Sequence, residues 1–277
     1  MAEGCSGECG SCGESGCGDR KGPGIQKAPQ NSASNIKHVI AVVSGKGGVG
    51  KSMVTGLLAG EMNKRGYKTG ILDADITGPS IPRMFGIKDR AGFDGTNVLP
   101  CESRGGMKVM SINLLLDNDT DPVLWRGSLI SGAVKQFWTD VAWGDLDYLF
   151  VDMPPGTGDV ALTVMQSLPV EGIIIVTSPQ ELVGMIVKKA VKMAEMMHVP
   201  VLGLVENMSY YKCPDCGKMI EIFGHSRLDE TAAELGLEKT ARLPVNPALA
   251  ALCDEGKADE IDAGDASAQV AAMIEGM

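Results

Sequence analysis

The chain has 277 residues, with 25 Lys plus Arg against 35 Asp plus Glu, so its formal net charge is −10. A chain this acidic lacks the broad basic face that non-specific nucleic-acid binding needs, and no nucleic-acid partner is expected. No apolar stretch approaches the ~20 residues of a membrane-spanning helix, and the N-terminus carries no apolar signal-peptide region. We therefore expect a cytoplasmic protein with no membrane partner.

Residues 1–35 form a tail rich in Gly, Ser, Cys and Pro, with hardly any large apolar side chain. Such a segment cannot bury a core, so we expect it to be flexible. Four of the eight cysteines of the chain lie within thirteen residues of this tail: Cys5, Cys9, Cys12 and Cys17. The neighbouring glycines would let the tail wrap around an iron–sulfur cluster, while a zinc site or a merely thiol-rich segment are the alternatives.

Short apolar runs alternate with helical patterns from His38 onward. The expected strands are 38–44, 69–73, 107–112, 147–152, 172–177, 200–206 and 239–243, and the most regular helical patterns cover 181–197 and 226–235. Near-continuous apolar strands separated by helices predict a doubly wound, mostly parallel sheet that is covered on both faces. Residues 36–277 are therefore expected to form one α/β domain, with its ligands beyond the carboxyl ends of the strands.

The segment after the first strand is rich in glycine and carries two lysines. It reads Gly45, Lys46, Gly47, Gly48, Val49, Gly50, Lys51 and Ser52. This fits the phosphate-binding pattern G-x-x-x-x-G-K-[ST], in which Lys51 reaches the β- and γ-phosphates and the Ser52 hydroxyl ligates Mg²⁺. Apolar residues then recur at helical spacing, which places the phosphates at a helix N-terminus. The sequence predicts a P-loop NTPase that binds ATP and Mg²⁺.

Two later strands end in acidic residues. Asp75 follows the strand 69–73, and Asp152 closes the strand 147–152. A carboxylate at the end of a buried strand commonly supports the Mg²⁺ of a P-loop enzyme, and this is the role predicted for Asp152. Asp75 is predicted to polarise the attacking water. Either aspartate alone could instead cap a helix, but the pair beside an intact phosphate loop favours ATP hydrolysis, with Lys51 and Asp75 as catalytic residues.

A C-x-x-C knuckle, Cys213 and Cys216, lies within a loop expected at 209–220. Two thiolates at this spacing bind one metal ion or one edge of a cluster, whereas a closed zinc or [4Fe–4S] site needs four ligands. Only the isolated Cys101 and Cys253 remain in the globular part. Two knuckles that meet across a two-fold axis would supply four thiolates. Half a zinc ribbon, a redox pair and a structural turn are the alternatives.

These motifs together resemble the Mrp/ApbC family of iron–sulfur cluster carrier ATPases, within the MinD/ParA-type deviant P-loop superfamily. The resemblance covers residues 36–257 and rests on GKGGVGKS, DADITGPS, WRG, DYLFVDMPPGTGD, VTSPQ, GLVENMS, CPDCG and IFG. It implies a homodimer that holds a labile [4Fe–4S] cluster between two CPDCG loops. It also implies that the cluster passes to apo iron–sulfur acceptor proteins and that ATP hydrolysis is required for delivery.

The resemblance also implies roles for single residues. Lys46 would cross the dimer interface to offset charge at the partner's nucleotide, Asn207 would read the adenine base, and Pro244 would belong to the loop that closes over it. Two residues depart from the family pattern. Met53 stands where a small residue is usual, and Ile186 stands where many members have Asp, so no polar role is implied there. The spacing of the tail cysteines also differs from the N-terminal ferredoxin-like motif of eukaryotic cytosolic scaffolds.

Two other functions fit the P-loop. One is a MinD- or ParA-like positioning ATPase, and the other is an electron-transfer ATPase like the nitrogenase iron protein. MinD-like proteins end in a basic amphipathic helix, whereas residues 266–277 contain no Lys or Arg. A positioning ATPase of either type has no role for the CPDCG motif. The nitrogenase iron protein binds its cluster through widely separated single cysteines and not through a C-x-x-C pair. The sequence therefore favours a cluster carrier.

Overall fold

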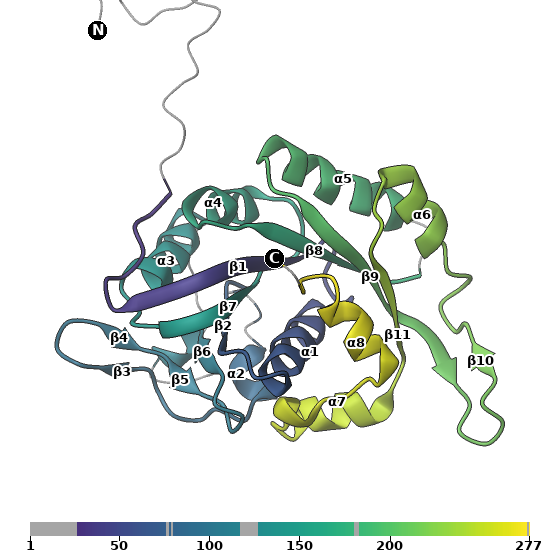
Figure 1. The fold of residues 1–277 in the computed structure, drawn as a ribbon, viewed down its shortest axis with the longest axis horizontal. Coiled ribbons are helices and arrows are strands. Elements are labelled where there is room, and N and C mark those ends of the chain that lie inside the picture. Colours follow the sequence, from purple (N-terminus) through teal and green to yellow (C-terminus); the bar gives the residue numbers. More distant parts are fainter. Residues whose placement is uncertain (1–26, 76–77, 79, 117–126, 180–182, 276) are drawn as a thin grey trace, which may run out of the picture.

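The computed structural model describes residues 27–75, 78, 80–116, 127–179, 183–275 and 277 (Figure 1). The tail cysteines Cys5, Cys9, Cys12 and Cys17 lie outside the described residues. Among the described residues, nine strands form one sheet in the order β10-β9-β8-β1-β7-β2-β6-β5, with β11 also beside β9. The strands are β1 (Ser34–Ser44), β2 (Thr69–Asp73), β5 (Cys101–Glu102), β6 (Lys108–Met110), β7 (Gly144–Asp152), β8 (Gly172–Thr177), β9 (Val201–Lys212), β10 (Met219–Ile220) and β11 (Thr240–Pro244).

The interior of this sheet is parallel. β1 pairs in parallel with β7 and β8, β2 with β7 and β6, and β9 with β8 and β11. Only β5 and β10, at the two ends of the described strand order, run antiparallel to their neighbours. A separate hairpin, β3 (Gly92–Phe93) and β4 (Val98–Leu99), stands outside the sheet. The predicted doubly wound, mostly parallel α/β fold is confirmed.

Helices cover both faces of the sheet. They are α1 (Lys51–Lys64), α2 (Ile81–Met84), α3 (Gly127–Thr139), α4 (Asp159–Ser167), α5 (Val183–Met196), α6 (Leu228–Leu235), α7 (Pro247–Asp254) and α8 (Asp265–Ala271), with short 3₁₀ helices η2 (Ile112–Leu114) and η3 (Ala258–Glu260). Figure 1 shows α3 to α6 on one side of the sheet and α1, α7 and α8 on the other. None of the described helices has the length and apolar character to cross a membrane.

β1 shows why the sheet needs both layers. Its residues Val39, Ala41 and Val43 belong to the apolar core beneath α3 to α6, while Ile40 and Val42 belong to the core beneath α1 and α8. Successive side chains of a strand point to opposite faces, so a continuous apolar run such as residues 39–43 needs cover on both faces. β1 therefore lies in the middle of the domain, and the loop at its carboxyl end opens onto the sheet edge where ligands bind.

The observed bounds differ from the expected ones at several elements, most of all at β9 and at β1, which begins at Ser34 rather than at residue 38. The strand expected at 200–206 continues as β9 to Lys212, so residues 209–212 of the expected loop are strand and only residues 213–218 form the turn before β10. The extension depends on pairing of Tyr211 and Lys212 with β10, which an apolar pattern ending at Glu206 did not indicate. At the other end of the domain, part of the segment assigned to the tail packs on the core: Trp138 Nε1 donates a hydrogen bond to the carbonyl of the buried Ala28.

Candidate functional site

The P-loop connects the end of β1 to the start of α1 and depends on its glycines. Gly48 and Gly50 have φ values of 79° and 82°, a region that L side chains rarely adopt. A Cβ at Gly50 would lie 2.2 Å from Nδ2 of Asn207, and one at Gly45 would lie 1.5 Å from Cγ2 of Ile186. Ile186, which departs from the family pattern, thus packs against the first residue of the loop.

Lys51, Ser52 and Asp152 come together at the start of α1. Lys51 is 6% exposed, and its Nζ lies 2.8 Å from Oδ1 of Asp152. The Ser52 hydroxyl donates to Oδ2 of Asp152 at 2.6 Å. The Thr55 hydroxyl donates to Oδ1 of the same carboxylate at 2.8 Å. Sequence reasoning missed Thr55, although its spacing from Ser52 on a helix places the two hydroxyls on one face.

Asp75 and Asp73 complete an acidic cluster around Lys51. Oδ2 of Asp75 lies 3.9 Å from Nζ of Lys51. Asp73 pairs in register with Asp152 across β2 and β7, is almost completely buried, and accepts hydrogen bonds from the Asp75 backbone N–H and the Ser111 hydroxyl. Burial raises the pKa of Asp73 well above its ordinary value, and the neighbouring Asp152 raises that pKa further. Asp73 was not predicted as a site residue, and its register with Asp152 was not visible in the sequence.

Replacing Asp73 with Asn is expected to stabilise the nucleotide-free protein at neutral pH by on the order of 1 kcal/mol, or ~2–4 °C in Tm. The pKa of Asp73 is raised in the folded state, so above the unfolded value near 3.8 the unfolded chain binds fewer protons than the folded one. Stability therefore falls as pH rises through this interval, and Asn removes the cause because it carries no charge. Thermal unfolding from about pH 4 to about pH 8 should show a difference that grows with pH.

Asp94→Asn is the control with the opposite sign. Backbone N–H groups of Asn97 and Thr96 lower the pKa of Asp94, so its loss should lower stability above that pKa. A lower Tm for Asp73→Asn than for wild type at neutral pH would contradict the assignment, since it would mean that the fold requires the charged carboxylate.

The donor set at the P-loop fits a magnesium nucleotide. The carboxylates of Asp75 and Asp152 outnumber the single ammonium of Lys51, so the cluster favours an added cation. Mg²⁺ prefers oxygen ligands such as Ser52 and Asp152 would provide. The N-terminus of α1 and the loop amides favour phosphate. On the far side of the loop, Nδ2 of Asn207 donates to the Val49 carbonyl at 2.9 Å. The buried Oδ1 of Asn207 has no hydrogen-bond partner among the described residues, which leaves an acceptor for a ligand.

One further segment lies next to this loop, and the segment around Pro244 lies beside β9. The N–H of Gly156, which has a φ of 90°, donates to the carbonyl of Ser44 at 2.7 Å and brings the segment after β7 to the base of the loop. Pro244 ends β11, and the N–H of the following Val245 donates to the Tyr210 carbonyl at 2.6 Å. Lys46 is half-buried at the start of the loop.

Cys213 and Cys216 lie apart from the P-loop, in the turn of a β-hairpin that projects from the body of the domain (Figure 1). The turn is closed by two hydrogen bonds, from Cys213 N–H to the Lys218 carbonyl and from Gly217 N–H to the Cys213 carbonyl, each 2.9 Å. Cys216 is exposed and Cys213 half-buried. Backbone N–H groups of Cys216 and Asp215 lower the pKa of the Cys213 thiol, which favours the thiolate that metals bind.

The remaining described cysteines differ from this pair. Cys101 is buried and Cys253 half-buried, and burial raises the pKa of both thiols. Within the described residues, no three His, Cys, Asp or Glu side chains are grouped so that they could hold a metal ion. Exposed apolar side chains continue along the hairpin and the segment after it: Met219, Ile220, Ile222 and Phe223.

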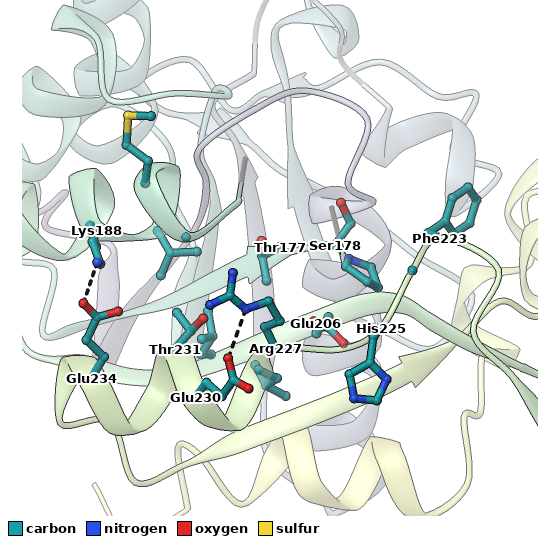
Figure 2. Close-up of a pocket in the computed structure, with 17 residues that line it drawn as sticks. Thr177, Ser178, Lys188, Glu206, Phe223, His225, Arg227, Glu230, Thr231 and Glu234 are labelled. Atoms are coloured by element: carbon teal, nitrogen blue, oxygen red, sulfur yellow. Dashed lines mark hydrogen bonds and ion pairs between the residues drawn. The ribbon is translucent and has the colours of Figure 1, made fainter. Parts of the chain in front are cut away.

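A cavity of about 630 Å³ lies between β8, α5, α6 and the segment that follows β10 (Figure 2). Ion pairs between Lys188 and Glu234, at 2.6 Å, and between Arg227 and Glu230, at 3.0 Å, cross parts of its lining. None of the described residues that line it belongs to the P-loop, but Glu206 does line it, one residue before Asn207. The cavity therefore borders the strand that joins the two candidate sites.

Comparisons with known proteins agree with this geometry. Residues 35–276 match the model of the NUBPL iron-transfer P-loop NTPases, a ParA-type family. The chain is 50% identical over 234 residues to an iron–sulfur cluster carrier protein from Clostridium perfringens, with 82% of each chain covered. A nucleotide-binding protein from Archaeoglobus fulgidus, solved in complex with ADP, has a TM-score of 0.75 at 46% identity, covering 82% of this chain and 89% of that one. The MinD cell division protein of Aquifex aeolicus has a TM-score of 0.59 at 19% identity, covering 87% and 97%, which shows a common fold alone.

Proposed function

Because the chain belongs to the ParA-type family of NUBPL iron-transfer P-loop NTPases, we infer that it is an iron–sulfur cluster carrier that binds and hydrolyses ATP. The observation that carries this inference is the thiol pair Cys213 and Cys216 at the tip of a hairpin on an otherwise complete P-loop domain. A positioning ATPase of the MinD or ParA type accounts for the sheet and the loop but gives this pair no role. An electron-transfer ATPase of the nitrogenase iron-protein type would need separated single cysteines.

The cargo is proposed to be a [4Fe–4S] cluster shared by two copies of the chain. Such a cluster takes four protein thiolates, and the hairpin of one copy offers two. Met219 and Ile220, exposed beside the thiols, supply apolar surface that a second hairpin would cover. The lowered pKa of Cys213 supports thiolate ligation. An apo iron–sulfur acceptor protein would then take the cluster from this exposed position.

The P-loop site is proposed to drive delivery. Lys51 would offset the charge of the transferred phosphoryl group, Ser52 and Asp152 would hold Mg²⁺, and Asp75 would orient the attacking water beside Lys51. Bound Mg²⁺ neutralises charge on the phosphate oxygens. Asn207 is assigned to the adenine because its buried Oδ1 remains available as an acceptor, and Pro244 to the loop over the base. Lys46 is assigned to the partner's nucleotide from the family resemblance.

Cluster transfer to an apo-acceptor is expected to be accelerated by ATP in the wild type, at least fivefold, and to lose this response in Asp75→Asn. The substitution keeps the shape of the side chain and removes the carboxylate that would polarise water, a change typically worth a factor of ~10² in rate. Acceptor activation is followed under anaerobic conditions with and without ATP.

Asp145→Asn is the matched control, because Asp145 is exposed at the start of β7 and should leave the ATP response unchanged. If cluster transfer has the same rate with and without ATP, in wild type and in Asp75→Asn alike, the proposed coupling of hydrolysis to cluster transfer is contradicted.

A further inference from the structure

β9 contains an irregularity between the two candidate sites. Glu206 pairs with Arg242 of β11 and Tyr210 pairs with Pro244, so three residues of β9 lie opposite the single residue Leu243. Within this bulge, Met208 has a φ of 56°, in the left-handed region. A non-glycine residue held there is strained, and such strain persists only where the surroundings over-determine it. The bulge, which contains Asn207, is thus a defined structural feature between Glu206 and the strand end that leads to the cysteine hairpin.

Arg242 spans this bulge with its guanidinium. Its Nε donates to the Ser209 hydroxyl at 2.7 Å and lies 3.8 Å from Oε1 of the buried Glu206. Its Nη2 donates to Oε1 of Glu221 at 3.0 Å, and its Cζ stands 5.7 Å from the ring centroid of Tyr210. One side chain therefore contacts residues before, within and after the bulge, as well as the segment that leaves β10. A planar guanidinium with several fixed donors suits such a junction, whereas an ammonium does not.

The same strand contacts the P-loop from within the bulge and the proposed adenine loop directly after it. Within the bulge, Asn207 donates to Val49 of the P-loop. After it, the Tyr210 carbonyl accepts from Val245 in the proposed adenine loop. A shift of the P-loop or of the proposed adenine loop would therefore move β9 within a few residues of Cys213.

We propose that Arg242 is a positioning residue that couples the nucleotide site to the cysteine hairpin by bracing the β9 bulge against Glu221. The role of this coupling rests on the proposed function: the bound nucleotide would alter how tightly the hairpin binds the cluster. The path consists of consecutive contacts along one strand and needs no long-range network. Coupling of this kind is reciprocal, so an occupied hairpin alters nucleotide affinity by the same factor.

The cavity of Figure 2 gives the braced segment room to shift. Glu206 lines it from β9, and Phe223, His225 and Arg227 line it from the segment after β10. Close packing in protein interiors resists movement of a segment past its neighbours. A segment that borders a cavity lacks this restraint on the side of the cavity. Glu221 accepts hydrogen bonds from both Arg242 and His225, and His225 lines the cavity. Glu221 therefore connects Arg242 to the cavity wall.

Hydrogen exchange at the hairpin tests the coupling without any cluster. Full-length wild type and Arg242→Met are compared with and without saturating Mg-ADP, by mass spectrometry of peptides covering residues 211–222. The protein is kept dilute enough for sedimentation velocity to show single copies, so that hairpin contacts between copies do not contribute. In wild type, nucleotide should change the exchange rate at least threefold, because the turn amides of Cys213 and Gly217 report local opening. In Arg242→Met the ratio should be near one.

Two further variants make the result decisive. Glu221→Gln removes the charge that Arg242 and His225 contact after β10, at a partly exposed position. It should also reduce the nucleotide response while leaving Tm unchanged. Arg227→Met removes an exposed arginine whose Nε pairs with Glu230 of α6, and it should keep the wild-type response.

A wild-type response retained in Arg242→Met, or no response in wild type, would overturn the inference. Because the protein carries no cluster in this experiment, a response lost in Arg242→Met would stand even if transfer to an acceptor proved independent of ATP. The two proposals can therefore fail separately.

Discussion

Cys213→Ser is expected to abolish the bridging cluster. Anaerobic reconstitution of the parent protein should give about four irons per dimer at the hairpins, and the variant should give almost none. Each hairpin supplies two thiolates, so the substitution leaves a dimer with half of the required ligands and with serine oxygens that iron–sulfur clusters do not favour. Iron and acid-labile sulfide analysis, together with absorption and electron paramagnetic resonance spectra, measure the loss.

The comparison is made in a chain in which Cys5, Cys9, Cys12 and Cys17 are all replaced by Ser, so that tail thiols do not contribute iron. Cys253→Ser is the matched control. It removes a half-buried thiol whose pKa is raised by burial, and it should leave the iron content unchanged. Tightly bound zinc at about one ion per chain, lost in Cys213→Ser, would instead assign the hairpin to a zinc ribbon.

Lys51→Ala is expected to lower the rate of ATP hydrolysis by ~10²–10³-fold, the usual effect of removing one group that stabilises the transition state. Lys51 is the cation next to Asp152 and Asp75, and its loss leaves phosphate and carboxylate charges facing each other. Phosphate release with saturating Mg-ATP measures the effect. Lys68→Ala, at an exposed position, is the control that should keep the wild-type rate.

The Lys51→Ala chain also tests the role assigned to Lys46. Mixed with Lys46→Ala chains, it would form heterodimers in which one site keeps its own Lys51 and receives the partner's Lys46, so part of the activity should return. Wild-type hydrolysis by Lys51→Ala alone would contradict the P-loop assignment. Wild-type hydrolysis by Lys46→Ala alone would contradict a role across the dimer.

The fold class, which the structure confirmed, and the predictions of the P-loop and of Asp152 all depend on contiguous patterns. The loop from Gly45 to Ser52 is specified by glycines that need positive φ or close approach, and Asp152 follows directly from a run of buried strand residues. The fold class followed from apolar strands with no polar face. Each of these features is contained within about ten neighbouring residues, where sequence patterns are informative.

The features that escaped prediction depend on pairing between distant segments. Asp73 became part of the site because β2 and β7 place it beside Asp152, and its raised pKa comes from burial that no local pattern contains. The extension of β9 to Lys212 requires β10, and the junction at Arg242 requires β9, β11 and Glu221 to meet. Register across a sheet is set by tertiary packing, so single-sequence reasoning has no access to it.

The antiparallel strands at the ends of the sheet also bear on how the protein behaves at high concentration. β5 and β10 are each two residues long, and β11, beside β9, ends in Pro244, which has no N–H to offer. Long, flat strand edges recruit other chains into aggregates, and short or proline-terminated ones resist it. Two copies of this domain would accordingly meet through side chains rather than by extending one sheet into the next. An assembly held in that way can come apart without breaking a ladder of backbone hydrogen bonds, which suits a protein that must release what it carries.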